Sequence, residues 1–271
     1  MLGLKSFYLF FKEIFEQRKT VWALAKNDFK QQYLGSALGM SWAFIQPTIM
    51  IALYWFVFTF GFKSPPLEKV PFICWLVAGL IPYFFFSDAW SKATNVVTEY
   101  DYLVKKIVFP VRVLPLLKLI SASYIHLFFI AFVIVLFAAY GFYPNLYYLQ
   151  IFYYLFALWV LLLGLSWFTC AVQVFLKDMS QLVVVSVQIL FWGTPILYPV
   201  TLLKAHPAIL TLLKLNPLFY IVEGYRDIFV NHVWFWEHPG LTLYFWVFSF
   251  CMLLFGMLVF QRLRPHFADV L

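Results

Sequence analysis

The polar side chains that could carry chemistry are few and scattered along the chain. Its five histidines form no cluster: His232 and His238 share one stretch, but no third ligand is spaced to complete a metal site with them. Glu99 and Asp101 could serve a membrane-embedded enzyme, although two acids in one loop are more typical of a solvated segment. We therefore expect no metal site and no catalytic residue in this chain.

Motifs that bind nucleotides or activate nucleophiles are absent from the sequence. There is no G-x-x-x-x-G-K-S/T loop to cradle ATP phosphates, no G-x-S-x-G elbow and no H-E-x-x-H pair. A proton relay would need several acids or histidines facing one another inside apolar segments. Only His126 and Asp88 are placed for that, and a structural role is the simpler interpretation. If this chain moves a solute uphill, another protein must supply the energy.

The stretch Glu99–Lys118, EYDYLVKKIVFPVRVLPLLK, combines cations with an apolar tip. Lys105 and Lys106 precede the apolar residues IVF at 107–109, and Pro110 then breaks the helix. A short helix with an apolar tip between cations suits a groove in another protein. The alternative is a basic segment beside the membrane that only fixes topology.

The composition indicates a membrane protein. Of 271 residues, 64% are hydrophobic, 23% aromatic and only 11% charged, and the mean hydropathy is +0.86. Soluble domains carry about 25% charged residues, and a soluble fold of this length cannot bury so much apolar surface in its interior. Cys74, Cys170 and Cys251 each lie in an apolar run, so we expect buried thiols and no disulfide framework.

Uncharged stretches long enough to cross a bilayer define the spans, since a crossing helix needs about 20 apolar residues. The longest stretch, 119–176, is divided by the turn GFYPN at 141–145. We predict an all-α membrane protein in which residues 1–271 form a single transmembrane domain. Its six spans are 38–61, 70–90, 119–141, 148–175, 180–200 and 240–261.

The distribution of Lys and Arg predicts the orientation. Fourteen of the 19 lie in the N-terminal segment, the loops after the second and fourth spans, and the C-terminal tail. By the positive-inside rule, both termini face the cytoplasm. The net charge of +7 follows from this topology, and we expect no nucleic-acid partner.

Two segments are predicted to stay out of the spans. Residues 5–34, within the N-terminal segment 1–36, show an amphipathic helical pattern, which fits either a passive interfacial anchor or a moving collar that touches a cytoplasmic partner. Residues 201–237 contain Pro207 and Pro217 and only short uncharged gaps. We expect two short helices that dip in from the outer face; the alternative is a compact outer cap.

At this point the sequence resembles a known family. LVKKIVFPVRVLPL resembles the coupling-helix region of the membrane subunits of type-2 ATP-binding-cassette exporters that move lipid-linked polysaccharides. Lys26–Pro47, Gly164–Met179 and Leu215–Phe229 resemble further blocks of that family in the same order. Within the family, FEQRKTVWALAKNDFK and IALYWFVFTFGF look more like wall teichoic acid translocation permeases than O-antigen or capsule permeases.

The resemblance implies a homodimer in a bacterial cytoplasmic membrane that exports an undecaprenyl-diphosphate-linked polymer, with wall teichoic acid as the expected cargo. It also implies two copies of a separate ATPase subunit, which would hold the ATP and Mg, so this chain needs no cofactor. The coupling helix would relay the closure of the ATPase pair to the spans. The residues that the resemblance assigns to ATPase contact are Lys105, Lys106, Val108, Phe109, Pro110, Arg112, Lys26, Asp28 and Lys30.

The polymer path should bind weakly and repeatedly, and aromatic faces offer amphipathic contact without fixed charge. The path candidates are Tyr33, Trp42, Tyr54, Tyr83, Phe84, Trp192, Tyr198 and Arg226, although each aromatic could instead pack against lipid or helices. Arg226 could guide phosphates or simply pair with Glu223 or Asp227. Spans three and four contain no cation, which fits a polyphosphate cargo poorly. O-antigen or capsular polysaccharide is therefore the alternative cargo; an ion-driven carrier would need intramembrane acids and a repeat, and we find neither.

Overall fold

The computed structural model describes residues 15–35, 37–63, 70–105, 109–203 and 206–271, and these residues are predominantly helical, with no strand among them. The helices in chain order are α2 (Arg18–Gln31), α3 (Trp42–Phe56), α4 (Phe72–Thr94), α5 (Val96–Glu99), α6 (Asp101–Val104), α7 (Leu114–Ala139), α8 (Gln150–Gln173), α9 (Met179–Trp192), α10 (Pro207–Lys214), α11 (Pro217–Arg226), α12 (Pro239–Leu263) and α13 (Phe267–Val270). Short 3-10 or π segments are η1 (Gly39–Ser41), η2 (Val57–Gly61), η3 (Val111–Val113), η4 (Leu146–Leu149), η5 (Val200–Leu203), η6 (Asp227–Asn231), η7 (Phe235–Glu237) and η8 (Arg264–His266).

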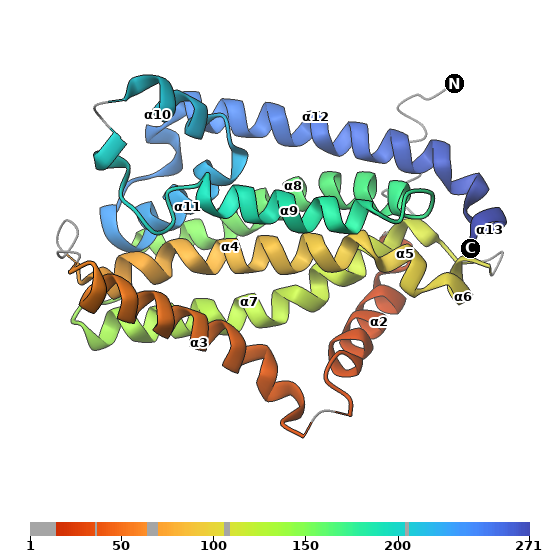
Figure 1. Cartoon of the computed structure of the whole chain (residues 1–271), viewed down its shortest axis with the longest axis horizontal. Helices are drawn as coiled ribbons and strands as arrows, with labels where there is room; N and C mark the ends of the chain where they lie inside the picture. Colours follow the sequence, from red (N-terminus) through yellow and green to blue (C-terminus); the bar gives the residue numbers. More distant parts are fainter. Residues whose placement is uncertain (1–14, 36, 64–69, 106–108, 204–205) are drawn as a thin grey trace.

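The long helices run side by side as a bundle with α4 in its middle (Figure 1). Among the described residues, five helical segments are long and apolar enough to cross a membrane: Gly39–Gly61, Phe72–Thr94, Val111–Ala139, Leu146–Gln173 and Pro239–Val270. They correspond to the first, second, third, fourth and sixth predicted spans. The all-helical prediction is therefore confirmed, and five of the predicted spans have a helix of spanning length.

The predicted fifth span, 180–200, is shorter in the structure. Its helix α9 has 14 residues and ends at Trp192, which gives a length of about 21 Å at 1.5 Å per residue. Gly193 follows, and Pro195 disfavours a helical conformation at Thr194. The prediction considered charge alone and overlooked these helix breakers. A complete crossing by this segment stays a prediction.

The most extensive contact between two helices joins α8 and α12. A Cβ atom on Gly164 would lie 2.6 Å from the backbone nitrogen of Leu253, and one on Gly256 would overlap the carbonyl oxygen of Gly164. The two backbones can approach this closely only because both positions lack a side chain, as in other small-residue contacts between membrane helices.

The segments between the long helices lie at the two ends of the bundle (Figure 1). Helices α5, α6 and α13 lie at one end, whereas α10, α11 and the connection between α7 and α8 lie at the other. The prediction of two short helices within 201–237 is confirmed by α10 and α11; α11 is largely buried and packs against α4. How deep these helices sit in a membrane stays a prediction.

Candidate functional site

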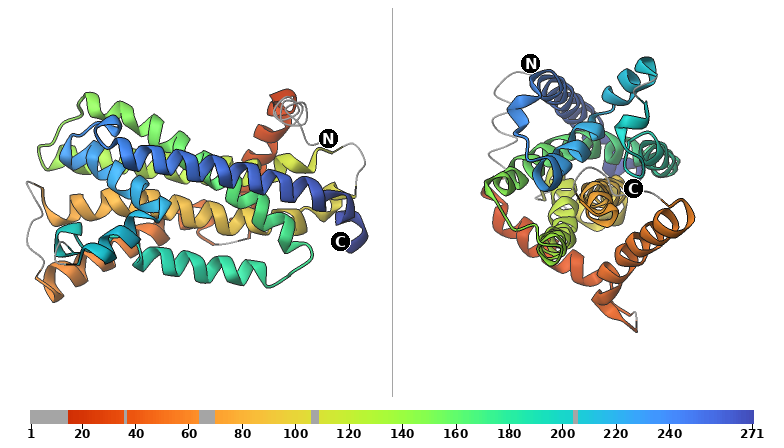
Figure 2. Two further views of the ribbon diagram at one scale, coloured as in Figure 1. Left: turned by 90° about the horizontal axis from the view of Figure 1, so that it is seen from above. Right: turned by 90° about the vertical axis from the view of Figure 1, so that its left-hand side faces the viewer.

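A cleft of about 1170 Å³ opens between α3, α4, α7 and α9. It exists because α3 leans away from the bundle, as the end-on view in Figure 2 shows. Only 11% of the apolar window of that span is buried, against 78% for the span that contains α4. Six of the eight path candidates line this cleft, namely Tyr33, Trp42, Tyr54, Tyr83, Phe84 and Trp192.

The cleft is long. On α3 its lining extends from Trp42 at the start of the helix to Tyr54 near its end. These positions are separated by about 18 Å of helical rise, more than half of the roughly 30 Å hydrocarbon core of a bilayer. A lining of this length suits an elongated ligand better than a compact one.

The deeper part of the cleft has an aromatic wall centred on Phe191. Its ring centroid lies 5.7 Å from that of Tyr54 and 4.9 Å from that of Tyr83. The Tyr83 hydroxyl donates to the carbonyl of Val187 at 3.1 Å, which connects α4 to α9. The wall is therefore formed by residues on three helices and presents aromatic ring faces instead of charged groups.

The other part of the cleft, which we call the mouth, is polar. Tyr33, Gln46, Ser87 and Asp88 contribute to its lining, and no Lys or Arg occurs among the described residues that line the cleft. Burial, together with the nearby Asp88 carboxylate, raises the pKa of the Tyr33 phenol, which therefore keeps its proton at neutral pH. The mouth offers hydroxyl, amide and carboxylate groups.

Tyr198 and Arg226 do not line the cleft. The Arg226 guanidinium is buried: it donates to the carbonyls of Pro195 at 2.6 Å and Ile196 at 2.9 Å and pairs with Glu223 at 2.6 Å. It also lies 3.6 Å from the ring centroid of Trp75. This geometry matches the ion-pair alternative for Arg226. Its contacts fasten α11 to the turn after α9, which is a structural role.

The predicted ATPase-contact segment is described in part, because Lys106 and Val108 lie outside the described residues. Lys105 is exposed, pairs with Asp101 at 3.4 Å and donates to the carbonyl of Leu271 at 3.1 Å. Phe109, Pro110 and Arg112 are half-buried, at the junction with η3. Of the predicted contacts on α2, Lys26 and Lys30 are exposed.

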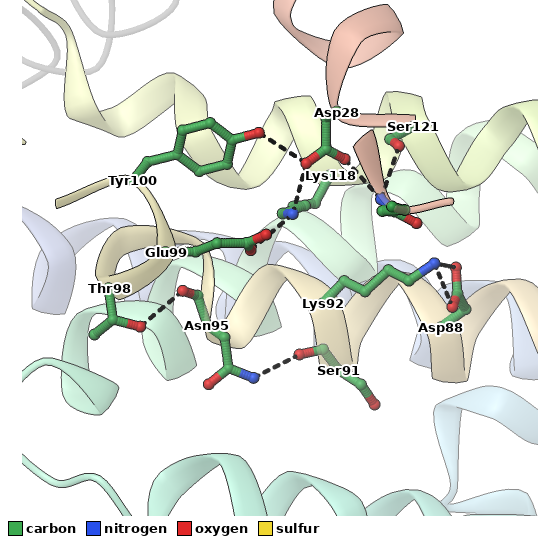
Figure 3. A network of polar contacts seen from close by, with 11 residues as sticks. Asp28, Asp88, Ser91, Lys92, Asn95, Thr98, Glu99, Tyr100, Lys118 and Ser121 are labelled. Carbon is green, nitrogen blue, oxygen red and sulfur yellow. Dashed lines mark hydrogen bonds and ion pairs between the residues drawn. The ribbon is translucent and has the colours of Figure 1, made fainter. Parts of the chain in front are cut away.

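Asp28 does not fit the predicted surface contact, because its side chain is buried in a polar network (Figure 3). Lys118 on α7 lies 2.7 Å from Asp28 and 2.7 Å from Glu99. The Tyr100 hydroxyl and the Gln32 amide each donate to Asp28 at 2.8 Å. The network joins three segments that the sequence analysis treated separately: the interfacial helix, the segment after α4 and the start of α7.

The electrostatics of this network keep Asp28 ionised. Burial opposes its charge, but the neighbouring Lys118 cation and the hydrogen bonds from Lys118 and Tyr100 outweigh burial and lower the pKa of Asp28. For Tyr100, burial and the hydrogen bond to Asp28 raise the pKa. The network is therefore a fixed ion pair at neutral pH.

Sequence reasoning missed the role of Lys118, which it counted only as a topological charge. A signal was present, since Asp28 follows Val21 and Ala25 at helical spacing on the apolar side of α2, and both of those residues are buried. A carboxylate on a buried face needs a cationic partner. Lys118, which directly precedes the longest uncharged run of the sequence (119–176), supplies that partner.

With this geometry established, the comparisons place the chain among multi-pass membrane transporters. Residues 19–230 match the family described as "ABC-2 type transporter", and the chain belongs to that family. It is also similar to the O-antigen export system permease protein RfbA of Myxococcus xanthus, 26% identical over 263 residues, which cover 95% of this chain and 97% of the relative. The protein of the same name from Klebsiella pneumoniae is 25% identical over 259 residues, 92% of this chain and 93% of the relative.

Membership of this family confirms the predicted class of protein, although not its cargo. The chain is a permease, a membrane component of an ATP-binding-cassette transporter, and its family implies an ATP-binding-cassette partner. The relatives carry the name of the predicted alternative, O-antigen export, and not that of teichoic acid export.

Proposed function

We propose that this chain is the permease subunit of an ATP-driven exporter that moves a lipid-linked polysaccharide of the O-antigen kind, and that the polymer passes along the cleft between α3, α4, α7 and α9. The observation that carries the proposal is the lining of the cleft: six aromatic path candidates converge on it, without a lysine or arginine among its described lining residues.

The lining suits a polysaccharide for a physical reason. Sugar rings have apolar C–H faces and polar edges, and aromatic side chains pack against such faces without fixing a charge. Contacts of this type are individually weak, so a chain can slide from one to the next. Wall teichoic acid, the first expectation, is the less supported cargo because it is a polyphosphate, and the relatives are named for O-antigen export.

The proposal includes a homodimer. Apolar side chains on α3 and α9 remain exposed beside the cleft, including Met50 (38%), Ile189 (65%) and Trp192 (65%). A second copy of the chain would cover this open side and turn a lateral cleft into an enclosed passage. Two ATPase subunits would bind at the end that holds α5 and α6. We also propose that the polymer is carried on undecaprenyl diphosphate. The chain then has six spans and two cytoplasmic termini in a bacterial membrane.

The proposal is tested with the permease and its co-expressed ATPase in proteoliposomes that contain lipid-linked O-polysaccharide. Export of the polymer and ATP hydrolysis are measured together. We expect Trp42→Ala to slow export severalfold, because Trp42 lines the cleft, whereas Trp55→Ala on the same helix, outside the lining, should change it little. Polymer accumulation by the permease without the ATPase, or equal effects of the two variants, would contradict the proposal.

A further inference from the structure

The mouth of the cleft contains the one charged side chain found among its described lining residues, Asp88 on α4. Both Asp88 oxygens lie 2.8 Å from the Nζ atom of Lys92, one helical turn further along α4 (Figure 3). The carboxylate is 36% exposed, and Lys92 does not line the cleft. A ligand in the mouth therefore meets the anion of this pair and not its cation.

The Asp88 carboxylate retains capacity to accept hydrogen bonds. An ionised carboxylate has about four lone-pair sites, and Lys92 contacts each oxygen once. The remaining sites are open to a donor in the cleft. An acceptor of this kind favours ligands that carry O–H or N–H groups and disfavours ligands that present only anionic oxygens.

The neighbours of Asp88 extend the same chemistry. Tyr33 keeps its phenolic proton and can donate or accept, and the Gln46 amide can do both. Ser87 lies in the same lining and donates to the carbonyl of Phe84 at 3.2 Å, so its oxygen is left as an acceptor toward the cleft. Mixed donors and acceptors beside an aromatic wall match the hydroxyl groups and C–H faces of a sugar.

We propose that Asp88, with Tyr33 and Gln46, forms a hydroxyl-binding site that selects uncharged sugar units over phosphate-containing ones, and that Asp88 determines this specificity. The proposal rests on the proposed function, since it requires that the polymer enters the cleft. A sugar hydroxyl donates to the carboxylate with the added strength of a charged acceptor. A phosphodiester has no proton to donate and is repelled by the same group.

Two matched probes test this site in the reconstituted complex with the ATPase. Both carry the same undecaprenyl diphosphate; one bears a neutral oligosaccharide and the other an oligo(glycerol phosphate) of equal length. The measurement is the probe concentration that gives half-maximal stimulation of ATP hydrolysis. Because the lipid diphosphate is common to both, any difference between the probes comes from the repeating unit.

The wild-type complex should respond to the neutral probe at the lower concentration. In Asp88→Asn, the half-maximal concentration of the neutral probe should rise about fivefold, the difference between a charge-assisted and an ordinary hydrogen bond. That of the phosphate probe should fall, because the carboxylate that repels the phosphates is removed. Asp88→Glu should restore the preference for the neutral probe. Asp178→Asn, an exposed acid in the loop before α9, is the control and should behave as the wild type.

Four results are informative. Equal responses of the wild type to both probes, or unchanged concentrations in Asp88→Asn, would overturn the specificity proposal while leaving ATP-driven export intact. A loss of response to both probes in Asp88→Asn and Asp88→Glu alike would also overturn it, since it would indicate a structural role. Failure of the neutral probe to stimulate the wild type would instead count against the proposed function.

Discussion

The buried pair of Asp28 and Lys118 gives the sharpest prediction for stability. We consider Lys118→Met, which keeps most of the length of the side chain and removes its charge. The variant leaves the Asp28 carboxylate buried, with hydrogen bonds from Tyr100 and Gln32 but without its cation. The free energy of unfolding should fall because an ionised group then lies in a poorly solvated site.

The expected size follows from the surroundings of the pair. Breaking a buried ion pair from one side costs about 3–5 kcal/mol. The lower end applies here, about 3 kcal/mol, because two neutral donors still reach Asp28. At about 2–4 °C per kcal/mol for a chain of this size, the melting temperature in detergent should drop by about 6–12 °C. Lys105→Met, which breaks a half-exposed pair with Asp101, is the control and should cost at most about 1 kcal/mol.

A double variant separates the ion pair from simple packing. Asp28→Asn in the Lys118→Met background removes the carboxylate charge that has lost its cation. It keeps an oxygen that can accept the hydrogen bond from Tyr100. Most of the lost melting temperature should therefore return, because replacing both partners of a buried pair is often nearly neutral. A double variant that is no more stable than Lys118→Met would refute the reasoning, as would an unchanged melting temperature in Lys118→Met itself.

The same pair predicts how stability depends on pH. The pKa of Asp28 is lower in the folded protein than the roughly 3.9 of an unfolded aspartate, so its contribution is complete above about pH 4 and is lost as the pH falls further. The pKa of Tyr100 is raised, so its contribution is complete below about pH 10 and is lost as the pH rises beyond it. Melting temperatures should therefore show no loss from this network between those limits, and a decline centred near pH 6 would contradict the assignment.

Three further variants test other parts of the structure. Gly256→Ala should cost about 3 kcal/mol by forcing α8 and α12 apart, whereas Gly240→Ala, which has open space, should be tolerated; thermal unfolding of both checks this. Arg226→Ala should also lower the melting temperature, by the equivalent of about 3 kcal/mol, because Glu223 loses its buried partner; unchanged stability would remove its structural role. Phe109→Asp should abolish polymer-coupled ATP hydrolysis by placing an unpaired charge at the expected ATPase contact, and normal hydrolysis in the reconstituted complex would reject that role.

The spans could be predicted because the bilayer imposes a length on them. The ends of the spans could not always be predicted, because each charged residue was taken to lie in a loop outside the membrane. The third span was predicted to begin at residue 119, after Lys118, but the helical segment begins at Val111 and buries Lys118 within it. A lysine is tolerated there because Asp28, 90 residues earlier in the chain, neutralises it. Such a long-range pair cannot be read from local composition.

The lining of the cleft was largely predictable, whereas the position of Arg226 was not. Aromatic residues on the first, second and fifth spans were chosen for their chemistry, and Trp42, Tyr83 and Trp192 do line one cleft. Arg226 was chosen for its charge, but its geometry depends on carbonyls exposed by the turn after α9. That turn forms only because the helix ends early, which the charge pattern did not reveal.

The network around Lys118 also joins the two halves of the proposed mechanism. Lys118 pairs with Glu99 at the end of α5 and with Asp28 on α2. Gln32, which follows α2 and donates to Asp28, directly precedes Tyr33 at the mouth of the cleft. A displacement of α5 by the ATPase is therefore expected to reach the mouth through this ion pair. The stable double variant Asp28→Asn/Lys118→Met tests this relay, because it should hydrolyse ATP at a near-normal basal rate but export less polymer for each ATP. An unchanged ratio of polymer to ATP would show that the pair only stabilises the fold.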